Sequence, residues 1–385
     1  MRVVLLASWY PDELKPLNGI FFKEQGEALS KSGIEVIVVN ININPIQNIF
    51  KDNGIRGLHI SEENGLKVYR YKTFNYFPKM YGAYIRYYSF LLNKIIRKIE
   101  REEGKIDVVH IHSAFDAGNA YSIIKNKTPY VITEHSSRYH RNVFNKVEEK
   151  MLYKTFSEAS KVIAVGNGLA EKVSKYCNGN TITILPNMVA TRNENILVDK
   201  SKKRFRFFSL AFLNEYKGMD ILIEAFNKNR EKFKDVELLI GGDGPERNRL
   251  LNLIKEYNLE KNIFLLGQLS REEVAYNMKN CDCFALASRV ETFGIVFIEA
   301  MQFGKPVIGT KTGGPDTFIN SKCGFVVEID NVDEFASSMI SVYEDYHKYD
   351  ENYIKEYCEN NFSEDVVVSK TKAIYKEIIG DTNVD

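Results

Sequence analysis

The chain has 385 residues, of which 44% are hydrophobic and 27% are charged, and its formal net charge is +1. This length predicts two domains, because a single hydrophobic core rarely extends beyond about 250–300 residues. The balanced charge gives no reason to expect a nucleic-acid partner. Five cysteines without a CxxC pair fit a reducing compartment. No signal peptide and no membrane-spanning stretch is recognisable, so we expect a soluble cytoplasmic protein.

Short β-branched runs recur in the first half of the chain, and a turn and a helical pattern follow each of them. Because these runs are almost continuously apolar, they predict parallel strands that are covered on both faces. The expected strands are Arg2–Ala7, Glu35–Val39, Ile106–His112, Pro129–Thr133, Lys161–Val165 and Thr181–Leu185. The helical patterns between them cover Ile20–Ser32, Ala83–Glu103 and Gly168–Tyr176.

A polar segment from Thr191 to Arg204 predicts a linker, and beyond it the same pattern restarts. Ser270 and Glu273 have the spacing of a capping box at the start of a helix. The alternation predicts an α/β protein with two doubly wound, Rossmann-like domains that face a ligand cleft. The strands expected in the second half are Phe205–Leu210, Val236–Gly241, Asn262–Leu266, Asp282–Leu286, Pro306–Gly309 and Phe325–Glu328.

The most informative segment runs from Ser288 to Ile308 and contains Glu291 and Glu299, eight positions apart. If a helix starts at Gly294, Glu299 lies about one and a half turns into it, whereas Glu291 precedes it. The backbone N–H groups at such a helix start form an anion site that suits a diphosphate. The two carboxylates would then contact different parts of one extended ligand.

This segment resembles the Glu-x7-Glu signature of retaining glycosyltransferases of family 4, the glycosyl transferases group 1, which have the GT-B fold. The resemblance covers nearly the whole chain. In the second half it also rests on Lys217-Gly218, Ile240–Glu246, Leu266-Gly267, Gly304-Lys-Pro-Val and Gly313-Gly314. In the first half it rests on Gly19, Asp107–His112, His135 and Pro186-Asn187. Ser8-Trp-Tyr-Pro and Gly19-Ile-Phe-Phe resemble bacterial transferases that build cell-surface polysaccharides.

The resemblance implies a role for individual residues. Lys217 would neutralise phosphate charge on the leaving group. Glu291 would accept hydrogen bonds from the donor sugar, and His135 would lie near carbon 6 of that sugar or contribute through its backbone. These three are the expected catalytic residues, and none of them is expected to act as a nucleophile. The expected donor-binding residues are Gly19, Lys217, Gly218, Phe293, Gly294, Ile295, Val296 and Glu299, with Glu299 on the ribose.

The resemblance further implies which part of the chain binds the acceptor and which part binds the donor. Residues 1–195 would form the acceptor domain, residues 196–362 the nucleotide-sugar domain, and residues 363–385 a helix that packs back on the first domain. The donor would be a nucleotide-diphosphate sugar, with a UDP-sugar expected. The acceptor would be a glycan or a polyprenyl-linked lipid. No further cofactor is expected, and the absence of an Asp-x-Asp triplet favours a metal-independent site.

The sequence departs from the family pattern at Phe212, where an Arg usually stands five residues before Lys217. Arg289 is a candidate replacement, and a solvated loop charge is the alternative interpretation of this residue. Two alternatives to a transferase stay open, of which the second gains support from Phe212. One is a sugar-nucleotide epimerase with the GT-B fold, and the other is a non-catalytic subunit that binds a nucleotide sugar. Release of a nucleoside diphosphate that depends on an acceptor would separate them from a transferase.

Several features have a structural interpretation beside the functional one. The glycines of Gly241–Gly244 are expected mainly to shape a loop. His110 and His112 are expected to face opposite ways along one strand, with at least one of them packing in the core. Residues 76–105 are basic and aromatic, with Arg86, Ser89, Asn93, Arg97 and Glu100 on one helical stripe. Such a helix can lie on the inner face of a membrane or pack on its own domain, and both alternatives stay open.

Overall fold

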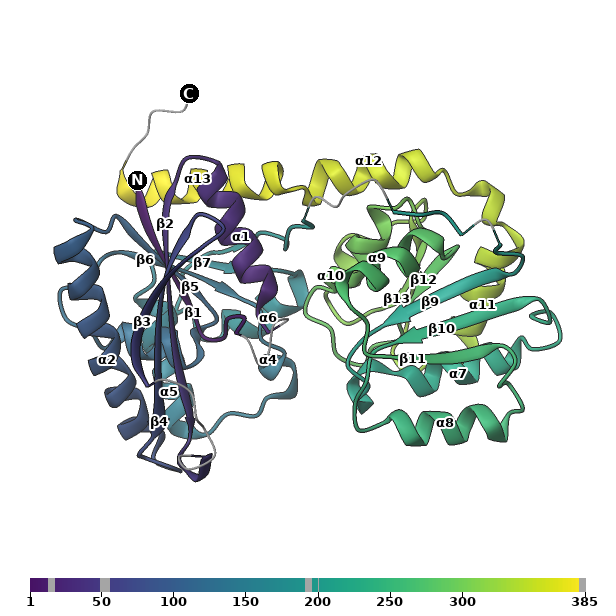
Figure 1. Cartoon of the computed structure of the whole chain (residues 1–385), viewed down its shortest axis with the longest axis horizontal. Coiled ribbons are helices and arrows are strands. Elements are labelled where there is room, and N and C mark those ends of the chain that lie inside the picture. The colour runs from purple at the N-terminus through teal and green to yellow at the C-terminus, as the bar shows by residue number, and fades with distance from the viewer. Residues whose placement is uncertain (13–17, 49–55, 191–195, 200, 381–385) are drawn as a thin grey trace. The chain divides into compact units, whose positions relative to one another are not determined.

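The computed structural model describes residues 1–12, 18–48, 56–190, 196–199 and 201–380. The chain forms two compact units, which Figure 1 shows coloured from purple to yellow along the sequence. The N-terminal unit comprises Met1–Met188 and Glu364–Asp385, and the C-terminal unit comprises Val189–Ser363. Within the described residues, no helix combines the length and the apolar character needed to cross a membrane.

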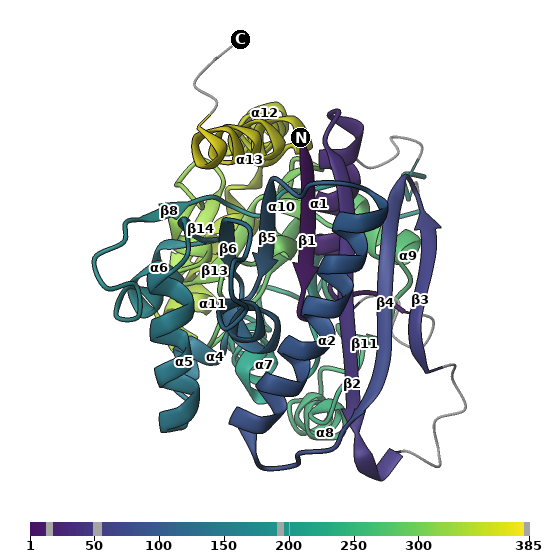
Figure 2. The ribbon, with the colours of Figure 1, turned by 90° about the vertical axis from the view of Figure 1, so that its left-hand side faces the viewer.

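The N-terminal unit is built on one eight-stranded sheet with the order β3-β4-β2-β1-β5-β6-β7-β8. All neighbouring strands are parallel except β3 and β4, which form an antiparallel hairpin at the edge of the sheet (Figure 2). The strands are β1 (Arg2–Ala7), β2 (Glu35–Pro45), β3 (Gly57–Glu63), β4 (Leu66–Asn75), β5 (Val108–His112), β6 (Tyr130–Glu134), β7 (Lys161–Ala164) and β8 (Ile182–Ile184).

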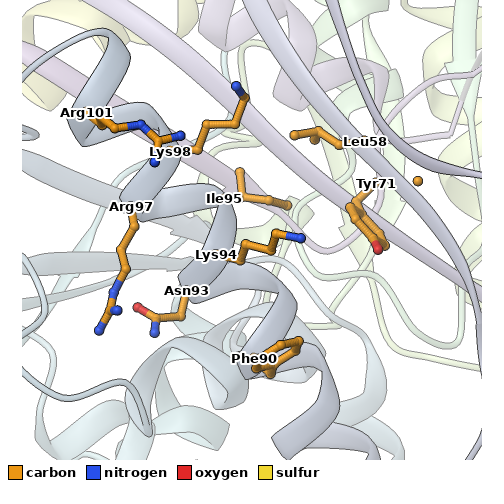
Figure 3. Close-up of a pocket in the computed structure, with 10 residues that line it drawn as sticks. Leu58, Tyr71, Phe90, Asn93, Lys94, Ile95, Arg97, Lys98 and Arg101 are labelled. Atoms are coloured by element: carbon orange, nitrogen blue, oxygen red, sulfur yellow. The ribbon is translucent and has the colours of Figure 1, made fainter.

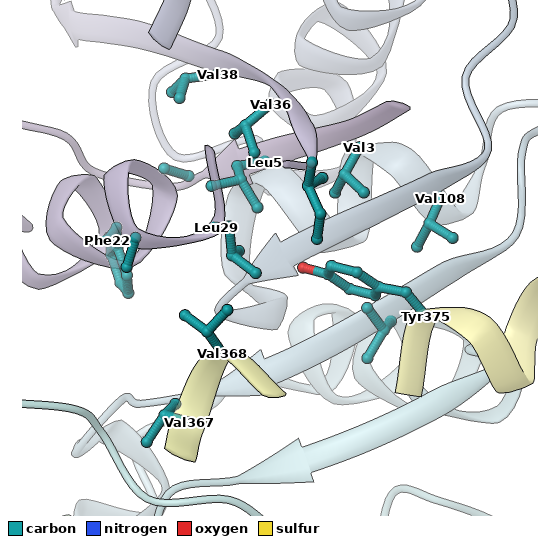
Figure 4. Packing of buried hydrophobic residues seen from close by; sticks show 14 of the residues in the cluster. Val3, Leu5, Phe22, Leu29, Val36, Val38, Val108, Val367, Val368 and Tyr375 are labelled. Carbon is teal, nitrogen blue, oxygen red and sulfur yellow. The ribbon is translucent and has the colours of Figure 1, made fainter. Parts of the chain in front are cut away.

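The helices of this unit cover both faces of the sheet. They are α1 (Ile20–Lys31), α2 (Tyr81–Glu102), α3 (Asn119–Ser122), α4 (Arg138–Arg141), α5 (Lys146–Ser157), α6 (Asn167–Ser174) and the last helix, α13 (Glu364–Ile379). Figure 4 shows α1 and α13 packing on one face, where Leu29, Val368 and Tyr375 meet apolar side chains of β1, β2 and β5. The hydroxyl of Tyr375 lies 2.5 Å from Nδ1 of the buried His110. The last helix is therefore part of the N-terminal core.

The C-terminal unit contains a six-stranded parallel sheet with the order β11-β10-β9-β12-β13-β14. Numbered within the unit, this order is 3-2-1-4-5-6, which is that of the Rossmann fold. The strands are β9 (Phe205–Leu210), β10 (Val236–Gly241), β11 (Ile263–Gly267), β12 (Cys283–Ala285), β13 (Val307–Thr310) and β14 (Gly324–Val327). The helices are α7 (Met219–Lys228), α8 (Arg247–Glu256), α9 (Arg271–Asn280), α10 (Ile295–Met301), α11 (Val332–Glu344) and α12 (Glu351–Phe362).

Each strand expected from the sequence is present, and three have the expected bounds: β1, β9 and β10. The capping box is also confirmed, since Ser270 Oγ accepts a hydrogen bond from Glu273 N and Glu273 accepts one from Ser270 N. The β3–β4 hairpin is an addition that the sequence analysis does not contain. Of the expected linker, residues 191–195 and residue 200 lie outside the described residues.

Candidate active site

The strand order of the C-terminal unit places two predicted site residues together. Lys217 ends the loop after β9, and Glu291 lies in the loop after β12, the strand that pairs directly with β9. This is the point where the strand order reverses, where α/β sheets bind their ligands. Lys217 Nζ donates to Glu291 Oε2 at 2.6 Å. The Glu291 side chain is 13% exposed and that of Lys217 24%, so the pair is sheltered and still accessible.

Two glycines allow the loops around this ion pair to pack closely. Gly218 has φ +58°, and a Cβ there would lie 1.9 Å from the carbonyl oxygen of Ala287. A Cβ on Gly314 would lie 2.8 Å from the backbone nitrogen of Phe293 and 3.0 Å from the carbonyl oxygen of Glu291. The Lys217–Gly218 turn therefore packs against Ala287, and the Gly313–Gly314 turn packs against Glu291–Phe293.

The donor-binding backbone predicted at Phe293, Gly294, Ile295 and Val296 lies at the start of α10. Gly294 is the residue that precedes the helix and has φ +92°. The N–H groups of the first helical turn have no acceptor within the helix, apart from that of Phe297, which donates to the Gly294 carbonyl. Glu299 lies within α10, behind this first turn, and is half-buried. The structure thus brings Lys217, Gly218, Glu291 and the α10 start into one region of the unit.

The glycine loop after β10 has the structural role that the sequence analysis favours. A Cβ on Gly242 would lie 1.9 Å from the Ala211 carbonyl oxygen, and one on Gly244 would lie 2.3 Å from that of Leu213. Leu213 N also donates to the Asp243 carbonyl at 2.9 Å. These glycines let the loop after β10 lie against the loop after β9.

The structure shows where Phe212 and Arg289 lie, and so whether Arg289 can replace the arginine missing at position 212. Phe212 is 63% exposed, so it does not belong to the core. Arg289 donates to Asp220 at 3.1 Å and to Asp330 at 2.6 Å, and also to the Glu215 carbonyl. Two carboxylates neutralise this guanidinium and fix its position. Arg289 therefore ties the loops after β9 and β12 together rather than supplying the missing phosphate-binding charge.

In the N-terminal unit, the loops after β1 and β5 also flank a reversal of strand order. Gly19 precedes α1 with φ +72°, and a Cβ there would lie 2.7 Å from the Trp9 carbonyl oxygen. The requirement for glycine at this position is therefore set by packing against Trp9, whatever the loop binds. Ser8 Oγ donates to the Phe115 carbonyl at 2.8 Å, which joins the two loops.

The expectation that His110 and His112 face opposite ways is wrong. Residues two apart on a strand point to the same face, and the two rings stack with centroids 4.3 Å apart. His110 is a packing residue, held by Tyr375 and by Thr133 Oγ1 at 2.7 Å. His112 Nδ1 instead lies 3.2 Å from Nε2 of His135.

His135 is buried in an apolar setting that keeps its ring neutral. Phe21 and Phe22 flank the ring with centroids 5.3 and 5.0 Å away. Burial lowers the pKa of His135 to about 3. Its second ring nitrogen, Nδ1, is buried, and the Asn187 side chain beside the ring partly opposes the lowering of the pKa. The imidazole can therefore accept or donate one hydrogen bond, and it is not a cationic acid near neutral pH.

The loop after β5 contains a carboxylate that the sequence analysis does not single out. Ser113 (φ +71°, ψ 128°) and Asp116 (φ +49°, ψ −79°) both have backbone angles that non-glycine residues rarely adopt. The buried Glu134 holds the loop by accepting hydrogen bonds from Ser113 Oγ, Ala114 N and Tyr139 Oη. Burial raises the pKa of Asp116 to about 6. Strained backbone of this kind concentrates at functional sites.

Replacing Asp116 with Asn should stabilise the protein near neutral pH and have little effect near pH 4. The folded state holds the Asp116 proton to about pH 6, whereas the unfolded chain loses it near 3.8, so stability falls as pH rises between these values. The gain expected above that window is up to about 3 kcal/mol. Thermal unfolding at about pH 4 and about pH 7.5 measures it, with the exposed Asp235→Asn as control. A pH-independent difference would contradict the assignment.

Comparison with known proteins identifies the family of the chain. The family model of Glycosyltransferase Family 4 matches residues 19–193, and that of Glycosyl transferases group 1 matches residues 192–359. An uncharacterized glycosyltransferase of Methanocaldococcus jannaschii, MJ1178, is 31% identical over 260 residues, which cover 66% of this chain and 70% of that protein. The gpi3 subunit of phosphatidylinositol N-acetylglucosaminyltransferase from Schizosaccharomyces pombe is 26% identical over 351 residues, covering 88% and 74% of the two chains.

Among solved structures, Anabaena HepE in complex with UDP superposes with a TM-score of 0.74 at 18% identity, covering 98% of this chain and all of that one. At this identity the likeness establishes the fold, in which both units are Rossmann-like. The chain therefore belongs to family 4 of the glycosyltransferases, the glycosyl transferases group 1, and has their GT-B fold.

Proposed function

We propose that the protein transfers a sugar, with retention of configuration, from a UDP-sugar to a glycan or a lipid-linked acceptor in cell-surface polysaccharide synthesis. The C-terminal unit would bind the donor and the N-terminal unit the acceptor, without a metal ion. The observation that carries the proposal is the Lys217–Glu291 pair at the strand-order reversal, next to the start of α10.

Each part of that region suits one part of the donor. The N–H groups that open α10 offer donors to the diphosphate, as helix starts do for phosphate groups generally. Lys217 adds the positive charge that a departing diphosphate requires. Glu291 accepts hydrogen bonds from sugar hydroxyls, and Glu299 from the ribose. HepE, which shares the fold, was solved with UDP, and this supports uracil as the base of the donor nucleotide.

In the proposed reaction the bond between the anomeric carbon and the β-phosphate oxygen breaks, and a bond from that carbon to the acceptor oxygen forms on the same face. The electron pair of the broken bond leaves with UDP. The acceptor hydroxyl gives its proton to an oxygen of the departing phosphate. His135, whose ring burial keeps neutral, would lie near carbon 6 of the donor sugar or contribute through its backbone.

A non-catalytic, sugar-nucleotide-binding subunit is the second candidate. Phe212 supports it, because one expected phosphate-binding cation is absent. The gpi3 relative is itself described as a subunit of a transferase. Such a protein would bind the donor without releasing UDP when an acceptor is added.

The test is thermal unfolding with a panel of nucleoside diphosphates and their sugars, with and without Mg²⁺, followed by acceptor-dependent UDP release. A ligand at about 100 times its dissociation constant should stabilise the fold by about 2.7 kcal/mol. We expect a shift with UDP or one UDP-sugar that does not depend on Mg²⁺, and UDP release on adding acceptor. Stabilisation without release favours the subunit. No shift with any nucleotide in folded protein would overturn both candidates.

A further inference from the structure

One face of α2 carries a concentration of positive charge that the fold does not use. Arg86, Lys94, Arg97 and Arg101 are exposed and recur at helical spacing on this face. The opposite face is buried and apolar, from Ile85 to Ile99. Ser89, which the sequence analysis places on the polar stripe, lies on the buried side. The domain therefore already covers one side of α2 and leaves the basic side in solvent.

An apolar side chain stands within this basic face. Phe90 is 67% exposed, and it lies one turn before Lys94. Just ahead of the helix, Met80 is 62% exposed and Tyr76 is 49% exposed. A large exposed apolar side chain within a basic helical face is typical of a surface that meets another apolar phase.

A cavity of ≈ 560 Å³ lies between this face and the β3–β4 hairpin. Its walls include Leu58 and Tyr71 of the hairpin and Phe90, Lys94 and Lys98 of α2. Figure 3 shows Lys94 reaching from the helix toward Tyr71, while Arg97 points away from the hairpin. The cavity thus joins an apolar wall to a cationic rim.

The rim has a surplus of positive charge. Among the residues that the structure describes, no carboxylate lies within ion-pair distance of Lys94 or Arg97. Lys98 pairs with Glu102, and Arg101 lies 3.8 Å from the same carboxylate. Glu100 and Glu103 are the other acidic residues near this end of the helix, and Glu103 pairs with Lys67 of β4. Four cations therefore face two carboxylates, so a ligand that carries phosphate would be attracted here.

We propose that this face of α2 binds an anionic phospholipid bilayer. The cavity takes a lipid phosphate, the cations on its rim and on the rest of the face contact neighbouring headgroups, and Phe90 enters the acyl region. Lysine and arginine suit this position, since their apolar stems pack in the interface while the charge stays at the headgroups. A bilayer accounts for the exposed Phe90, which the phosphate backbone of a nucleic acid would leave in water. The proposal does not depend on which reaction the protein catalyses.

The test is co-sedimentation of the full-length protein with vesicles of phosphatidylcholine alone and of phosphatidylcholine with about 30% phosphatidylglycerol. We expect binding to the anionic vesicles only, and its loss at about 0.5 M salt. Lys94→Glu with Arg97→Glu should weaken binding about 30-fold or more. The matched control, Lys146→Glu with Lys150→Glu, makes the same charge change at exposed positions of α5 in the same unit and should bind like wild type.

A second pair of variants tests how much the apolar side chain of Phe90 contributes to vesicle binding. Phe90→Ser should weaken binding about tenfold, whereas Val147→Ser on α5, which is 50% exposed, should leave it unchanged. Thermal unfolding confirms that each variant is folded. Equal binding of the two double variants, or equal binding to neutral and anionic vesicles, would overturn the proposal. Stabilisation by inorganic phosphate or glycerol phosphate without vesicle binding would overturn the bilayer and assign the cavity to a soluble phosphate compound.

Discussion

Glu291→Ala should lower kcat/KM for sugar transfer about 100- to 1000-fold or more and leave the protein folded. The carboxylate is 2.6 Å from Lys217 Nζ at the reversal of strand order, and only 13% of its side chain is exposed. Its removal frees the ammonium group from its position and takes away the proposed acceptor for the sugar hydroxyls. Initial rates of UDP release with a saturating acceptor measure the effect.

The control is an ion pair of the same length that has no place in the site. Lys232 Nζ lies 2.6 Å from Glu344, and both side chains are more than half exposed. Glu344→Ala should leave the rate unchanged, since exposed pairs contribute about 1 kcal/mol or less to stability. Glu291→Gln, which keeps the shape of the side chain, separates loss of charge from loss of packing. Turnover of Glu291→Ala close to that of wild type would remove Glu291 from the proposed mechanism.

The sequence predicts the sheets well because their strands are buried on both faces. Segments such as Arg2–Ala7 and Val236–Gly241 each contain a single charged residue and are otherwise apolar, and the structure has strands with these bounds. The β3–β4 hairpin lacks this pattern, because an edge strand with charged residues such as Glu62 and Glu63 is exposed on one side. A local signal does exist, since Asn64 and Gly65 both have positive φ, the Asn-Gly arrangement typical of a tight hairpin turn.

The candidate site could be predicted only residue by residue. Lys217 and Glu291 are 74 positions apart, and their contact depends on the pairing of β9 with β12, which the order of strands along the chain does not reveal. The resemblance to the family identifies both residues without a distance between them. Asp116 offers no such signal, because its burial and its positive φ arise from how the loop after β5 folds against Glu134.

Gly218→Ala should destabilise the C-terminal unit by about 3 kcal/mol or more and impair transfer as well. The residue has φ +58°, which costs a side chain energy wherever it stands, and its Cβ would also lie 1.9 Å from the Ala287 carbonyl oxygen. That carbonyl cannot easily move, since Leu286 N on one side donates to Ile308, and Arg289 N on the other donates to Tyr216. Relief must therefore come from the Lys217–Gly218 turn, which would shift Lys217 away from Glu291.

A second glycine separates the destabilisation caused by the positive φ from that caused by the contact with the Ala287 carbonyl. Gly267, in the same unit, has φ +79°, but the nearest atom to its Cβ position is Arg247 Nη1 at 3.9 Å. Gly267→Ala should therefore lower the free energy of unfolding only by the strain of a side chain on a left-handed backbone, about 1–2 kcal/mol. Denaturant unfolding of the two variants gives the difference, and UDP release shows whether activity falls with stability or beyond it. Equal destabilisation by both substitutions would mean that the loop after β12 moves to make room for the Cβ of residue 218. Gly218 would then serve only to allow the turn and would not hold Lys217 in place.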